Sequence, residues 1–126
     1  METILLVDDE LHVRTLVRDI LELSDYHVLE AGNAEEAFRV EAAHAGPIDL
    51  LLTDIMMPGL TGPEMARVIA ARRPTMKILY MSAFTLVDIE NQRIHLDPGV
   101  PILAKPFNVD VLTKKVRAVL GPARVA

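Results

Sequence analysis

The stretch LLTDIMMPGLTGPEM (residues 51–65) joins an apolar run to a single carboxylate and an abrupt turn. A short apolar run bounded by turn residues is typical of a strand that is buried on both faces of a parallel sheet. Asp54 ends this run, and Pro58 and Gly59 indicate that the chain turns soon after it. A charge at the end of a buried strand needs a partner. The stretch therefore predicts a functional group at the carboxyl edge of a sheet.

The composition of the chain limits the class of protein. With 126 residues the chain has the length of one domain with a real core, and we expect residues 1–126 to form that domain. Its 51% hydrophobic and 25% charged residues are typical of a globular protein in water. The absence of cysteine excludes disulfides and thiolate chemistry. A net charge of -5 argues against a nucleic-acid surface.

The first ten residues, METILLVDDE, do not resemble a targeting segment. Their apolar run is only five residues long and follows an acidic start, unlike a signal peptide or a membrane span. We therefore expect a cytoplasmic protein that contacts neither a membrane nor nucleic acid directly.

Short apolar runs alternate with helical patterns along the chain. Strands are expected at residues 3–7, 27–31, 48–53, 77–82 and 100–104, each followed by a helix. This strict alternation indicates βαβ units around a parallel sheet with both faces covered. The second run contains His27 and Glu30 and the fifth contains Pro101, which suits strands at the sheet edges. The expected fold is a doubly wound, flavodoxin-like (βα)5 three-layer sandwich with strand order 2-1-3-4-5.

The helix after the first strand shows the i, i+3, i+4, i+7 repeat of a helix that packs one face on a sheet. Its apolar stripe consists of Val13, Leu16, Val17, Ile20 and Leu21. Arg14, Arg18 and Asp19 lie off this stripe and are expected to face water. Asn33 and Asn108 are expected to be the N-caps of the second and the last helix.

Five polar side chains are expected to meet at the carboxyl edge of this sheet. Asp8 and Asp9 follow the first strand and Asp54 ends the third, its expected neighbour. Three carboxylates this close repel one another unless a cation joins them, and an acid-rich oxygen site prefers Mg²⁺. Ser82 and Lys105 end the fourth and fifth strands, where they offer a hydroxyl and a positive charge to a phosphate oxygen. Each residue alone is commonly structural, but their coincidence predicts a phosphoryl site.

Four motifs resemble those of response regulator receiver domains, the CheY-like family, and together they cover nearly the whole chain. The motifs are VDDE (residues 7–10), LLTDIMMPGLTG (51–62), MSA (81–83) and AKPF (104–107). Residues 81–107 also resemble the receivers attached to the C-terminus of hybrid sensor histidine kinases.

The resemblance implies a role for each residue of the expected site. Asp54 would accept the phosphoryl group, and Mg²⁺ would be held by Asp8, Asp9, Asp54 and the backbone carbonyl of Met56. Ser82 would be the switch hydroxyl. Lys105, in a cis peptide bond to Pro106, would neutralise charge on the phosphoryl group.

The same resemblance implies a non-enzymatic phosphorelay module. A sensor histidine kinase or a histidine phosphotransfer protein would donate the phosphoryl group from a phosphohistidine. Phosphorylation would then switch the binding of an unknown downstream protein at a face made by the fourth helix (residues 85–96), the fifth strand (100–104) and the fifth helix (108–120). The module is expected to be a monomer or a weak, phosphorylation-linked dimer.

Three positions depart from the family pattern. Ile102 stands where the family usually has an aromatic switch residue; it is either an ordinary strand residue, or the switch is weakened or carried by another group such as Phe84 or Phe107. Met56 and Phe84 flank the site, and neither can orient an attacking water by hydrogen bonding. We therefore expect slow loss of the phosphoryl group.

Two rival functions use the same fold or chemistry. A haloacid-dehalogenase phosphatase needs a second aspartate two residues after the first, but Met56 occupies that position, so a general acid is missing. A receiver-like scaffold that is never phosphorylated and binds partners constitutively is the second alternative. The presence of all five polar side chains disfavours it, whereas Ile102 keeps it open.

Overall fold

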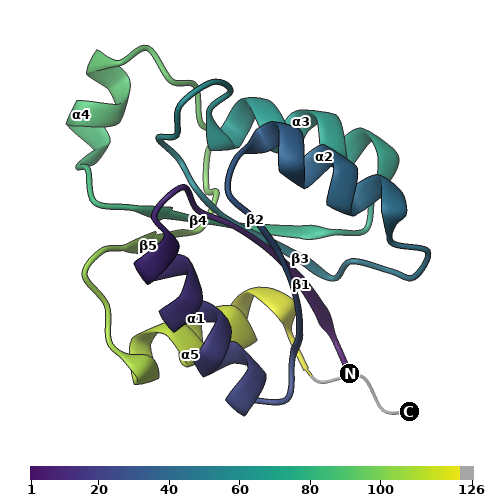
Figure 1. Cartoon of the computed structure of the whole chain (residues 1–126). Helices are drawn as coiled ribbons and strands as arrows, with labels where there is room; N and C mark the ends of the chain where they lie inside the picture. Colours follow the sequence, from purple (N-terminus) through teal and green to yellow (C-terminus); the bar gives the residue numbers. More distant parts are fainter. Residues whose placement is uncertain (123–126) are drawn as a thin grey trace.

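The computed structural model describes residues 1–122 and shows a parallel sheet between two layers of helices (Figure 1). The strands are β1 (Thr3–Val7), β2 (His27–Ala31), β3 (Leu50–Asp54), β4 (Lys77–Ser82) and β5 (Ile102–Ala104). The helices are α1 (Leu11–Leu23), α2 (Ala34–Ala43), α3 (Gly62–Arg72), α4 (Leu86–Asn91) and α5 (Val109–Leu120). The strand order β2-β1-β3-β4-β5, with every pair parallel, confirms the predicted doubly wound fold.

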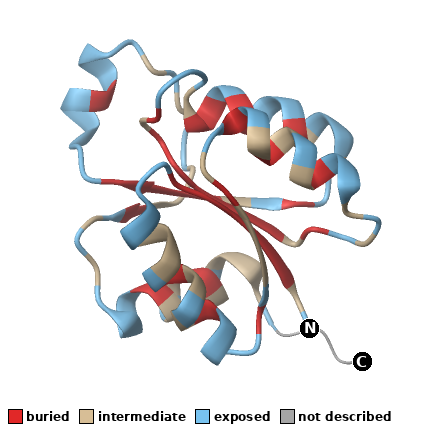
Figure 2. Ribbon diagram, in the orientation of Figure 1, coloured by how far each residue is buried: buried red, intermediate tan, exposed pale blue. Residues whose placement is uncertain are grey.

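Alternate side chains of the central strands enter two separate cores. Leu5, Leu51 and Tyr80 pack with α2, α3 and α4 on one face of the sheet, whereas Ile4 and Leu52 pack with α1 and α5 on the other. Figure 2 shows the central strands buried along most of their length. Both faces are covered, which explains why these strands lack polar alternation. None of the helices within residues 1–122 has the length and apolar character needed to cross a lipid bilayer.

Side-chain caps fix where several helices begin. The Oδ1 atom of Asn33 accepts a hydrogen bond from the Glu36 N–H at 2.9 Å, and Asn108 accepts one from the Val111 N–H at 2.9 Å. Both predicted N-caps are thereby confirmed. Thr61 and Thr85 cap α3 and α4 with reciprocal capping boxes.

The predicted helix over residues 85–96 is too long. The helix ends at Asn91, and Arg93 follows with a left-handed φ of 57°. Beyond it, Ile94 and Leu96 pack against the α2 and α3 side of the core as irregular chain. Their spacing of two residues is that of an extended segment, which explains why a helical interpretation of this apolar stretch was wrong.

Two further local predictions need correction. The fifth strand begins at Ile102 rather than residue 100, because Pro101 has no N–H and contributes only its carbonyl, which accepts from the Tyr80 N–H at 3.2 Å. In α1, Leu16 is 61% exposed and does not join the core. Arg14, which was expected to face water, is instead largely covered, with a side chain 18% exposed.

Candidate functional site

The sheet register brings the predicted site residues to one edge. Val7, just before Asp8, lies opposite Thr53, so the ends of β1 and β3 are adjacent. Asp54 lies opposite Met81, and Ser82 lies opposite Ala104, the residue before Lys105. One carboxylate oxygen from each of Asp8, Asp9 and Asp54 lies within 4.8 Å of the others. The predicted cluster of carboxylates therefore exists in the folded chain.

Lys105 joins the two buried carboxylates. Its Nζ atom donates to Asp8 Oδ2 and to Asp54 Oδ2, both at 3.0 Å. Asp8 and Asp54 are buried, whereas Asp9 is exposed. The Lys105–Pro106 peptide bond is cis, as the resemblance to receiver domains implied. The lysine thus supplies a positive charge at the point where the three acidic groups converge.

Burial and charge act in opposite directions on the two groups of this pair. Burial raises the pKa of Asp54 above its ordinary 3.8; the Lys105 charge and hydrogen bond lower it, but Asp8 and Asp9 add to the rise. Burial would lower the pKa of Lys105, but the charges and hydrogen bonds of Asp54 and Asp8 outweigh it and raise that pKa. The Lys105 ammonium therefore remains charged at neutral pH.

The chain after Asp54 turns back tightly against it. Gly62 begins α3 and donates its N–H to the Ile55 carbonyl at 2.8 Å. A Cβ atom at Gly62 would lie 2.2 Å from the Asp54 carbonyl oxygen, so only glycine fits there. Sequence reasoning gave Gly62 only as the last residue of the motif around Asp54. It did not detect that α3 presses directly on the backbone of Asp54.

The two remaining predicted site residues are Ser82, at the end of β4, and Met56, in the loop after β3. The Ser82 hydroxyl accepts from the Phe84 N–H at 3.0 Å and donates to the Phe84 carbonyl at 3.3 Å, so in this state it holds the loop after β4. Met56 follows Asp54 in the loop before α3, and its side chain packs against the α2 and α3 core. Phe84 is 49% exposed. Neither Met56 nor Phe84 offers a side-chain hydrogen bond for a water.

Ile102, which stands where the family usually has an aromatic residue, has a buried aromatic neighbour that sequence reasoning missed. Ile102 lies opposite Tyr80 on β4, and both side chains enter the same core. Burial raises the pKa of Tyr80 to about 12. Phe107, considered above as a substitute, packs in the core on the opposite face of the sheet from Ile102. A substitute for the missing aromatic is therefore to be sought in Tyr80 or Phe84.

The donor set suits a hard divalent cation. Three carboxylates converge from the ends of β1 and β3, and oxygen is the ligand that Mg²⁺ prefers. Two of these carboxylates already share the Lys105 ammonium, which shows that their oxygens are arranged around a positive charge. The residues present therefore fit a magnesium site.

Comparison with known proteins gives the family. Residues 4–117 match the model of the response regulator receiver domain. The chain is 32% identical over 120 residues to the response regulator receiver protein CpdR of Brucella abortus, covering 95% of this chain and 98% of CpdR. Several other curated relatives are longer, and the chain spans about half of their length or less.

Solved structures agree in fold and sequence. The receiver domain of the hybrid histidine kinase CckA is 32% identical with a TM-score of 0.79, covering 94% of this chain and 99% of that one. The response regulator TrrA of Thermotoga maritima, in complex with Mg(2+)-BeF, is 32% identical with a TM-score of 0.75, covering 94% and 99%. TrrA in complex with the histidine kinase ThkA gives a TM-score of 0.73, covering 96% and 100%.

The chain therefore belongs to the response regulator receiver domain family. Members of this family are the phosphoacceptor modules of two-component phosphorelays, and this chain is such a signal-transduction module. The resemblance to receivers of hybrid histidine kinases is confirmed by the likeness to the CckA receiver.

Proposed function

We propose that this receiver, residues 1–126, accepts a phosphoryl group on Asp54 in a Mg²⁺-dependent step. One observation carries the proposal: Lys105 Nζ lies 3.0 Å from both Asp8 and Asp54 in a cluster of three carboxylates at the sheet edge. A buried carboxylate beside a fixed ammonium is prepared to attack a phosphorus atom while the ammonium stabilises the charge that develops on the phosphoryl oxygens.

The proposed transfer replaces one bond to phosphorus by another. A carboxylate oxygen of Asp54 forms a bond to phosphorus, and the phosphorus–nitrogen bond of the donor phosphohistidine breaks; with acetyl phosphate, the bond to the acetate oxygen breaks instead. Lys105 donates to the phosphoryl oxygens. Mg²⁺ bound by Asp8, Asp9, Asp54 and the Met56 carbonyl would supply further charge neutralisation there. For Ser82 to donate to the phosphoryl group, its hydroxyl must leave Phe84.

The proposed donor is a sensor histidine kinase or a histidine phosphotransfer protein. TrrA, a relative of this chain, has been solved with the histidine kinase ThkA, which supports a partner of this class. We place the whole exchange in the cytoplasm, with the receiver a monomer or a weak, phosphorylation-linked dimer.

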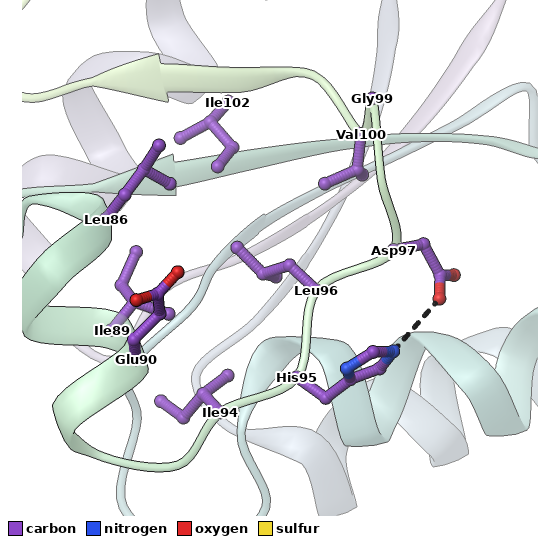
Figure 3. Close-up of a pocket in the computed structure, with 10 residues that line it drawn as sticks. All are labelled: Leu86, Ile89, Glu90, Ile94, His95, Leu96, Asp97, Gly99, Val100 and Ile102. Atoms are coloured by element: carbon purple, nitrogen blue, oxygen red, sulfur yellow. Dashed lines mark ion pairs between the residues drawn. The ribbon is translucent and has the colours of Figure 1, made fainter.

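The proposed output face comprises α4, β5 and α5. Leu86 and Val87 of α4 are 61% and 64% exposed, which leaves apolar surface free for a downstream protein. Beside them a hollow of ≈ 360 Å³ separates α4 from β5, and Figure 3 shows Ile102 in its wall, facing Leu86. Release of Phe84 by Ser82 would move the start of α4 and thereby change this hollow.

The test is the intact mass of the chain after incubation with Mg²⁺ and acetyl phosphate. We expect the wild type to gain one phosphoryl group, and neither Asp54→Asn nor the wild type in EDTA to gain any. The Asp49→Asn variant should behave as the wild type, because Asp49 directly precedes the amino end of β3 and Asp54 lies at its carboxyl end. A gain that persists in Asp54→Asn would place the acceptor elsewhere.

Ile102 supports one alternative, a receiver-like scaffold that binds partners constitutively. In the family, an aromatic side chain at this position usually couples the phosphorylation site to the binding surface, and Ile102 has no aromatic ring to do so. No mass gain in the wild type, with acetyl phosphate or with a panel of histidine kinases, would favour the scaffold over the phosphoacceptor.

Replacing Met56 by asparagine should speed loss of the phosphoryl group about tenfold, because an amide can orient the attacking water that a thioether cannot. The rate is measured as the decay of the phosphorylated mass after the donor is removed by gel filtration. Leu60→Asn, which places the same amide at an exposed position of the loop that contains Met56, serves as control. Equal decay rates in Met56→Asn and the wild type would contradict the prediction.

A further inference from the structure

Arg14 contacts the backbone at the acidic cluster, although its place on α1 predicted exposure to water. Its Nη1 atom donates to the Asp8 carbonyl at 2.7 Å, and its Nε atom donates to Glu30 Oε1 at 3.3 Å. The guanidinium therefore joins β2 to the loop between β1 and α1. This loop carries two of the three carboxylates.

The contact completes the set of hydrogen bonds around Asp8. The Asp8 N–H donates to the Ala31 carbonyl at 3.2 Å, and its Oδ1 and Oδ2 atoms accept from the Glu10 N–H and from Lys105. The carbonyl is the remaining polar group, and Arg14 holds it. That carbonyl belongs to the peptide unit joining Asp8 to Asp9. Its orientation decides where the exposed Asp9 carboxylate stands relative to the two buried ones.

Gly32 provides the space that Arg14 needs. A Cβ atom at Gly32 would lie 3.0 Å from Arg14 Nη1, tighter than ordinary van der Waals contact. The Gly32 N–H is itself held by Glu36 Oε1 at 3.1 Å, so the glycine backbone is fixed in place. A methyl group here would displace the guanidinium by a few tenths of an ångström without removing its charge.

We infer that Arg14 is a positioning residue for the magnesium site: by holding the Asp8 carbonyl, it orients the Asp8–Asp9 peptide so that both carboxylates face Asp54. The inference rests on the proposed Mg²⁺ site. Arg14 acts through the backbone and is not itself a ligand. Groups that orient metal ligands commonly change metal affinity 10- to 100-fold when they are removed.

A charge effect and a geometric effect of Arg14 predict opposite changes in Mg²⁺ affinity when this residue is replaced. If Arg14 acted mainly through its positive charge, its removal would make the site more negative and Mg²⁺ would bind more tightly. If it acts by orienting the peptide, its removal weakens Mg²⁺ binding. Because Glu30 already pairs with the guanidinium, we expect the geometric effect to exceed the charge effect.

The test is the Mg²⁺ dissociation constant of the full chain, measured by isothermal titration calorimetry well below the melting temperature. We expect Arg14→Gln to bind Mg²⁺ about tenfold more weakly than the wild type, and Gly32→Ala about threefold more weakly. Arg18→Gln is the matched control. Arg18 lies one turn further along α1, pairs with the same Glu30 at 3.0 Å and carries the same charge. It should stay within about twofold of the wild type.

Each outcome decides the inference. Unchanged or tighter binding in Arg14→Gln overturns it, as does equal weakening in Arg14→Gln and Arg18→Gln, which would assign the effect to the Glu30 ion pair. If Arg14→Gln does not fold, Gly32→Ala decides, since it retains the arginine. A wild type that does not bind Mg²⁺ would overturn the proposed function as well, so the two failures are distinguishable.

Discussion

Replacing Lys105 by methionine is expected to slow phosphorylation of Asp54 by acetyl phosphate about 100- to 1,000-fold, the loss that follows removal of one preorganised stabilising group. The Lys105 ammonium is the fixed positive charge at the cluster, 3.0 Å from Asp54 Oδ2, and it neutralises charge as the phosphoryl group approaches. The rate is read as the growth of the phosphorylated mass at saturating Mg²⁺.

A second lysine variant tests whether the loss of rate comes from the charge at the site or from the loss of any one positive charge. Lys77→Met removes an exposed lysine at the amino end of β4, whereas the site lies at the carboxyl ends of the strands. This substitution should leave the rate unchanged. Circular dichroism of Lys105→Met checks folding, because Asp8 and Asp54 lose a partner inside the protein. A folded Lys105→Met variant within threefold of the wild-type rate would show that the lysine does not act in the transfer.

The second large effect concerns stability. Replacing Arg73 by methionine should lower the free energy of unfolding by about 2–3 kcal/mol, because the buried Glu41 carboxylate loses one of its two arginine partners and three backbone carbonyls lose a donor. Arg73 donates to Glu41 Oε2 at 2.9 Å and to the backbone carbonyls of Glu41, His44 and Gly46, so it ties the end of α3 to the end of α2 and to the following loop. The Glu41 carboxylate is buried and would keep only Arg72.

The size of this loss should depend on pH. Burial would raise the pKa of Glu41, but the hydrogen bonds and charges of Arg73 and Arg72 outweigh it and hold the pKa below its ordinary 4.5. The stability from this contact is thus fully present above pH 4.5 and is lost as the pH falls through the lower, folded-state pKa.

Urea denaturation of wild type and Arg73→Met at pH 7 and pH 3 measures both effects. Arg39→Met breaks an exposed pair with Glu35 and should change stability by less than about 0.5 kcal/mol. Equal losses in Arg73→Met and Arg39→Met at pH 7 would contradict the assignment of Glu41 as a buried, paired carboxylate.

The order of the strands in the sheet could be predicted because the polarity of each strand indicates how far it is buried. Strands covered on both faces are largely apolar, as at residues 50–52, and the more polar β2 and the Pro101 region could only lie at the edges of the sheet. Once the order is known, topology alone places residues that follow β1, β3, β4 and β5 at one edge. The convergence of Asp8, Asp54 and Lys105 follows from that rule.

Contacts that depend on side-chain reach could not be predicted. A helical repeat gives the direction of a side chain but not the extent of the sheet beneath it, so Leu16 remained on the expected stripe although it is exposed. The same repeat assigned Arg14 to solvent, whereas its length lets it return to the Asp8 carbonyl. The two hydrogen bonds between Ser82 and Phe84 likewise leave no signal in the sequence.

The contact between Gly62 and the Asp54 carbonyl limits how this receiver can be redesigned. A codon library over residues 60–62 would accept many substitutions at Leu60, whose side chain is 39% exposed. At Gly62 every other amino acid begins with a Cβ atom 2.2 Å from that carbonyl oxygen, so surviving clones should carry only glycine. A redesign of the loop after β3 should therefore vary Leu60 and hold Gly62 constant.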